Sequence, residues 1–178
     1  MKLQKYFLTL LLIPFFGFVK DNDEFIDWSE SRRLGWDDFV APVNNKSDAA
    51  ASTSTYLGLE YNIRDNSFNY RIACRFYKTK SWGLVKNNWI LNHEQGHFDI
   101  TEIFARLLNK AMSEYVFNYK TYRKDVNTIY QNYMKQKELF QELYDTETDY
   151  SRNKKVQEEW LKKIEVLLKE TEEYANYN

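Results

Sequence analysis

Both histidines of this 178-residue chain lie four positions apart, in the sequence His93-Glu-Gln-Gly-His97. Residues at this spacing share one face of a helix, so the two imidazoles can bind a single zinc ion. No proline interrupts residues 81–119, and apolar residues recur there every three or four positions. This pattern predicts an amphipathic helix over roughly 84–117. Glu94 then lies beside the ligands and is the candidate general base.

The rest of the chain favours an α+β fold. Apolar and polar residues alternate on both sides of Asp65-Asn66, which predicts a β-hairpin over 55–77. Helical periodicity returns at roughly 120–143 and 152–175, and the stretch 144–151 breaks it. We therefore expect a small antiparallel sheet followed by three main helices, the first of which carries the motif.

A catalytic zinc ion usually takes three protein ligands, and no third histidine exists. The acidic stretch 144–151 is the main candidate supplier, with Asp145, Glu147 and Asp149. Glu147 would complete a set of two histidines and one glutamate, and we favour it. The alternative is that these carboxylates cap the third helix and bind no metal.

Three other residues of the motif helix, Asp99, Glu102 and Gly96, each have two possible roles. Asp99 and Glu102 lie well round the helix from the histidines, so they are better suited to orienting a ligand or pairing with other elements. Gly96 costs helix stability, and it is either a tolerated choice or a sign that another backbone or a substrate approaches closely beside the metal.

The N-terminal residues 1–20 have the pattern of a signal peptide. Lys2 and Lys5 precede an almost wholly apolar run, Tyr6 to Phe18, which is too short for an ordinary transmembrane helix. The cleavage site is poorly marked, so an uncleaved N-terminal anchor is the alternative. We expect an exported, periplasmic or secreted protein with a single domain over 21–178.

Composition argues against nucleic-acid binding and against a disulfide-bonded fold. The net charge of −1 gives no basic field for nucleic acid. Cys74 is the only cysteine, so no intramolecular disulfide can form. It lies in the alternating stretch of the hairpin, which predicts a buried core position and not a nucleophile.

Several motifs together resemble the bacterial "domain of unknown function 922" family, described as predicted secreted zinc-dependent proteases. The matching strings are Trp36-Asp-Asp-Phe39, Ser81-Trp82, Asn92-His-Glu-Gln-Gly-His-Phe-Asp-Ile100 and Tyr144-Asp-Thr-Glu-Thr148. They span most of the chain after the N-terminal segment. The resemblance implies a compact zincin-like domain with His93 and His97 as ligands and Glu94 as catalytic base.

The chain departs from that family at one position. The family's later block continues Tyr-Asp-x-x-Thr-x-His, whereas this sequence has Tyr150 in place of the histidine. Either Glu147 is the third ligand, or Tyr150 binds as a phenolate, or the site binds zinc weakly and is inactive.

Two functions follow from these observations. The first is an exported zinc peptidase that acts on a peptide or protein substrate, with Zn²⁺ as its cofactor. Hydrolysis of cell-wall peptides would use the same chemistry. The second is a catalytically impaired zincin-like binding protein at the cell surface or in the periplasm, an alternative that Tyr150 favours and the intact Glu94 disfavours.

Overall fold

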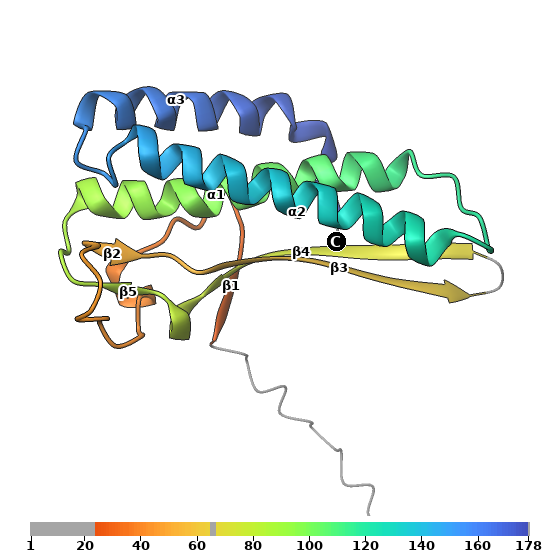
Figure 1. Ribbon diagram of the computed structural model, residues 1–178, viewed down its shortest axis with the longest axis horizontal. Coiled ribbons are helices and arrows are strands. Elements are labelled where there is room, and N and C mark those ends of the chain that lie inside the picture. The colour runs from red at the N-terminus through yellow and green to blue at the C-terminus, as the bar shows by residue number, and fades with distance from the viewer. Residues whose placement is uncertain (1–23, 65–66, 178) are drawn as a thin grey trace, which may run out of the picture.

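Helices cover one face of an antiparallel hairpin in the computed structural model, which describes residues 24–64 and 67–177 (Figure 1). Strands β3 (Thr55–Arg64) and β4 (Ser67–Tyr77) form the hairpin, and β1 (Phe25–Asp27) pairs with the other edge of β4. A second, two-stranded sheet joins β2 (Ala51–Ser52) to β5 (Trp82–Gly83). The predicted α+β class and hairpin are confirmed. The predicted signal peptide and the Asp65-Asn66 turn lie outside the described residues.

The hairpin pairs without interruption from Thr55↔Phe76 to Arg64↔Ser67. Ile72, Cys74 and Phe76 all lie in the core, because alternate residues of a strand point to the same face. The prediction that Cys74 is a buried core residue is therefore confirmed.

The three main helices are α1 (Asn88–Ser113), α2 (Tyr122–Glu147) and α3 (Lys154–Glu170). Short 3-10 turns occur at Trp36–Asp38 (η1), Lys78–Lys80 (η2) and Glu172–Tyr174 (η3). The Asn87 side chain caps α1 by accepting a hydrogen bond from the Ile90 amide at 2.9 Å. The predicted break at 144–151 starts too early, because α2 continues through Glu147.

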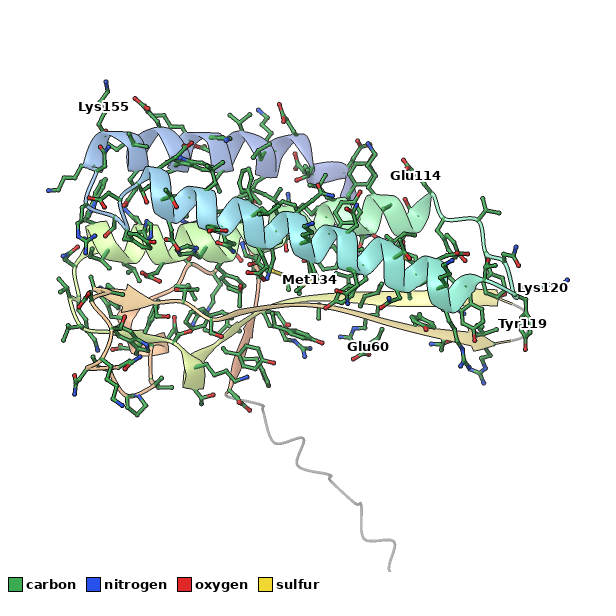
Figure 2. The ribbon with its side chains drawn as sticks, in the orientation of Figure 1. Glu60, Glu114, Tyr119, Lys120, Met134 and Lys155 are labelled. Atoms are coloured by element: carbon green, nitrogen blue, oxygen red, sulfur yellow. The ribbon has the colours of Figure 1, made fainter. Side chains whose placement is uncertain are left out.

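Helix α1 lies between the hairpin and α3, with α2 alongside it (Figure 1). The sequence predicts a helix with one buried stripe, but α1 is buried on several sides because three elements pack around it. Polar residues are therefore buried with the apolar ones, among them Gln95, Asp99, Glu102 and Arg106. The outer surfaces are polar: Lys155 projects from α3 away from the sheet, and Glu60 projects from β3 away from the helices (Figure 2).

Gly96 marks the closest approach of α2 to α1. A Cβ atom added at Gly96 would lie 2.5 Å from the Tyr144 hydroxyl oxygen and 2.9 Å from Cζ. Tyr144 is fully buried, and its ring also packs against Trp160 at a centroid distance of 5.5 Å, so a shift of the ring would disturb a second contact. A close approach does occur at Gly96, but the Tyr144 side chain makes it and not the backbone or substrate expected from the sequence.

Gly96→Ala should lower the free energy of unfolding by about 1–2 kcal/mol, because overpacking against Tyr144 outweighs the gain in helix propensity of about 1 kcal/mol. Urea unfolding followed by circular dichroism would measure the change. Gly35→Ala is the matched control, since its nearest neighbour would be 3.9 Å away, and it should change stability by less than about 0.5 kcal/mol. Equal effects at both positions would contradict this account of Gly96.

Candidate metal centre

Three possible metal ligands converge where α1 and α2 meet. His93 and His97 lie one turn apart on α1, and Asp145 lies in the last turn of α2. Asp145 Oδ1 is 3.1 Å from His93 Nε2 and 3.1 Å from His97 Nε2. The donor atoms of all three residues lie within 4.8 Å of one another. Zinc bonds of about 2.0–2.1 Å in a tetrahedron would separate ligand atoms by about 3.3 Å, so this donor set fits a zinc ion.

Asp145 takes the place that the sequence analysis gave to Glu147. Because α2 continues through both residues, their side chains lie about 200° apart around the helix. Glu147 faces α3, where its carboxylate accepts a hydrogen bond of 2.7 Å from Trp160 Nε1. The expected break would have freed both carboxylates to turn toward the histidines, and the continuous helix allows only Asp145 to do so.

Gln141 orients the ring of His97, and sequence reasoning missed this role. The Gln141 amide nitrogen donates to the His97 carbonyl oxygen at 2.9 Å, which leaves Oε1 as an acceptor 2.5 Å from His97 Nδ1. His97 must therefore carry a proton on Nδ1, and its Nε2 faces Asp145. The spacing of Gln141 and Asp145, four residues apart on one helix face, was the available signal.

The charges at this centre favour a cation. Burial alone would raise the pKa of Asp145, but hydrogen bonds from His93 and His97 lower it well below its usual range. Burial opposes protonation of His97, yet the hydrogen bond and charge of Asp145, followed by the charge of Glu94, raise its pKa. With Nδ1 already protonated, Nε2 of His97 needs either a second proton or a metal ion between itself and the carboxylate.

The aromatic ring of Tyr144 packs against both imidazoles and holds them in place. Its ring stacks on His93 at a centroid distance of 4.6 Å and meets His97 edge-on at 5.0 Å. The hydroxyl donates to the His93 carbonyl oxygen at 3.3 Å, and burial raises the pKa of this phenol, so it stays neutral. His93 Nδ1 is buried without a hydrogen-bond partner within the described residues, so stacking holds this ring.

Glu94 lines the cleft in which both histidines lie, and only 4% of its surface is exposed. In the part of the chain that the structure describes, its carboxylate forms no ion pair. A buried carboxylate without a fixed cationic partner is available to accept a proton from a bound molecule.

The cleft has a volume of about 810 Å³, within the usual range for ligand sites. Its walls come from residues 49–55, from α1, from α2, and from the loop 150–152. It is therefore large enough to hold a segment of an extended chain beside the histidines.

Tyr150 lies at this cleft on a strained loop. Asp149, Tyr150 and Ser151 all have left-handed backbone conformations, with φ of 48°, 51° and 71°. Each costs about 1 kcal/mol or more in a residue other than glycine. Hydrogen bonds hold the loop, from Tyr150 N to the Asp145 carbonyl at 2.8 Å and from Trp89 Nε1 to the Ser151 carbonyl at 2.8 Å.

The Tyr150 side chain is 57% exposed and lines the cleft. Tyr150 therefore lines the same cleft as the candidate ligands. Asp145, in contrast, has its carboxylate oxygen in direct contact with both histidines. This placement makes Tyr150 better suited to contact a ligand than to coordinate a metal ion.

Asp99 and Glu102 lie on the opposite side of α1 and contact residues outside it, one of the two roles expected for them, and Glu102 also pairs with Arg106 of α1 itself. Asp99 accepts hydrogen bonds from Trp28 Nε1 at 2.9 Å and from Arg33 at 2.9 Å. Glu102 accepts from Arg106 Nε at 2.7 Å and from the Tyr177 hydroxyl.

Comparisons of the chain with protein-family models, curated proteins and solved structures find no match. Among the described residues, no helix combines the length and the apolar character needed to cross a membrane. The site is therefore interpreted from its own geometry and chemistry.

Asp145→Asn should weaken zinc binding about tenfold or more, because among the described residues Asp145 alone brings an anionic oxygen into contact with both histidines. Glu147→Gln is the matched control and should leave zinc affinity unchanged. Competition with a chromophoric chelator would measure both affinities. A larger loss for Glu147→Gln than for Asp145→Asn would restore Glu147 as the third ligand.

Proposed function

We propose that this protein is a zinc-dependent peptidase with a zincin-like fold. The observation that carries the proposal is the convergence of His93 Nε2, His97 Nε2 and Asp145 Oδ1 at the wall of a cleft that Glu94 also lines. Two imidazoles and one carboxylate suit zinc better than the hard cations calcium and magnesium, which prefer sets of oxygen ligands. A motif helix packed on an antiparallel sheet supports the zincin-like assignment.

When bound, zinc would polarise a scissile carbonyl and lower the pKa of a water molecule. The residues of the chain would supply the rest. Gln141 and Tyr144 hold the imidazoles, which limits reorganisation of the site during the reaction. Glu94 would take a proton from the attacking water and pass it to the leaving amine, since its carboxylate faces the cleft.

The resemblance to the "domain of unknown function 922" proteins agrees with this proposal but rests on short motifs. Tyr150, which stands where that family has a histidine, has its own role here. Its phenol offers a hydrogen-bond donor at the cleft and would contact the carbonyl or backbone of a bound peptide. The pattern of residues 1–20 supports export of the protein.

One observation favours a second function, that of a metal-free binding protein. Asp145 lies within hydrogen-bond distance of both Nε2 atoms, so a protonated His97 would satisfy the carboxylate without any metal. In that case the cleft would bind a peptide and Glu94 would have no catalytic role. Elemental analysis of purified protein separates the two functions, because only the first requires about one zinc per chain.

Glu94→Gln should reduce hydrolysis of a mixed peptide library by about 10²- to 10⁴-fold, because the amide keeps the shape of the side chain but cannot accept a proton. Zinc content and the circular dichroism spectrum should stay unchanged. The assay compares the zinc-loaded wild type with the variant by mass spectrometry of the products.

Glu102→Gln, which changes a carboxylate on the opposite side of α1, controls for loss of a buried charge. It should affect stability more than turnover. The peptidase proposal fails if the zinc-loaded wild type cleaves nothing in the library, and the role of Glu94 fails if Glu94→Gln cleaves as fast as the wild type.

A further inference from the structure

A buried lysine lies in the cleft, and the proposed reaction does not use it. Lys137 is on α2 and only 4% of its surface is exposed, yet it lines the cleft together with Thr55 and Gln141. Lysine is almost never fully buried unless its ammonium group has a partner. An anion is therefore expected to pair with the Lys137 ammonium group at this position in the cleft.

The partner that the structure gives to Lys137 is unusual. Its Nζ atom is 2.9 Å from Glu138 Oε1, a carboxylate on the next residue. Adjacent residues on a helix point about 100° apart, so Glu138 has to fold back around α2 to reach the ammonium group. The Glu138 side chain is 65% exposed and also lines the cleft.

This ion pair is easily exchanged. Glu138 is mostly solvated, so releasing its carboxylate to water costs little, whereas the buried Lys137 ammonium always requires an anion. An ammonium group also has three N–H donors. A carboxylate that enters the cleft can thus take the position that Glu138 holds, and the observed pair shows that a carboxylate fits there.

We propose that Lys137 is a subsite for a carboxylate of the bound peptide, with Glu138 as the internal group that this carboxylate displaces. The inference deepens the proposed peptidase function by naming a substrate class: peptides that carry an acidic side chain or a free C-terminus near the scissile bond. The inference depends on the proposed function in one respect only, which is that the ligand is a peptide.

The spacing along α2 sets the distance from the candidate metal centre. Lys137 and Asp145 are eight residues apart, which corresponds to about 12 Å along the helix axis. An extended peptide advances about 3.3 Å per residue, so the carboxylate would lie roughly three or four residues from the scissile bond. This spacing would place the preferred carboxylate at the end of the cleft near Lys137 and away from the metal centre.

The test is equilibrium binding of fluorescein-labelled peptides to zinc-loaded Glu94→Gln protein, in which the probes stay intact. In one set of short neutral peptides with amidated C-termini, a single Glu moves along the chain and is compared with Gln at each position. In a second set the free C-terminal acid is compared with the amide. Fluorescence anisotropy then identifies which carboxylate is preferred.

At one or more positions the carboxylate probe should bind about tenfold to a hundredfold more tightly than its neutral counterpart. Adding Lys137→Gln should abolish this preference. Adding Glu138→Gln should increase it severalfold, since the competing internal carboxylate is gone. In a protein with both changes the gain should vanish, because it depends on the ammonium group.

Lys135→Gln and Glu142→Gln are matched controls, since both residues are exposed on α2 and neither lines the cleft. The proposal is overturned if no probe shows a preference for the carboxylate, or if Lys137→Gln keeps the preference. These binding measurements do not test hydrolysis. If the wild type cleaves peptides without regard to their charge, the peptidase function is retained although the subsite is rejected. If a carboxylate binds at Lys137 but the wild type hydrolyses no peptide, the subsite is retained although the peptidase function is rejected.

Discussion

The packing of α2 along α1 is the contact on which the candidate site depends. Tyr144 lies against Gly96, and the missing Cβ allows the helices to approach until Asp145 and Gln141 reach the imidazoles. A wider separation would break both contacts, because each rests on one short side chain. The same aromatic ring supports His93 and His97, so one buried tyrosine determines the helix spacing and the ligand orientation together.

The sequence predicts elements better than it predicts the contacts between them. Alternation along 67–77 and the periodicity around His93 depend only on local spacing, and both are confirmed. The end of α2 was missed, because the acidic run after Tyr144 looks like a break in an apolar pattern. Of the polar residues there, Asp145 lines the cleft and Glu147 accepts a hydrogen bond from Trp160 on α3, so the helix continues although the apolar pattern has ended. The misplaced helix end explains why the sequence favours Glu147 whereas the structure brings Asp145 to the histidines, since side-chain direction in a helix depends on unbroken spacing.

Lys137 could be found only with the fold known, and the four-residue spacing of Gln141 from Asp145 becomes informative only once Asp145 is placed beside the histidines. Each is an ordinary polar residue of an exposed-looking helix in the sequence. Their position next to α1 follows from the tertiary packing of α2, which no local pattern encodes. Likewise, three consecutive residues in left-handed conformations at 149–151 carry no glycine that would signal them. The loop is held by hydrogen bonds to α1 and α2, so tertiary contacts override the backbone preference.

The proposed carboxylate subsite would also constrain how a peptide lies in the cleft. Lys137 lies toward one end of the cleft, and the candidate metal centre lies toward the other. Because the cleft walls limit screening by water, the Lys137 ammonium group would act on a ligand more strongly than an exposed charge would. If the proposed subsite binds the free C-terminus of a peptide, that peptide would have only one chain direction with its backbone at the histidines, whereas an internal acidic side chain would allow both directions. In either case the fixed distance between Lys137 and the histidines would set the register of the bound peptide, so the buried lysine would contribute to register as well as to affinity.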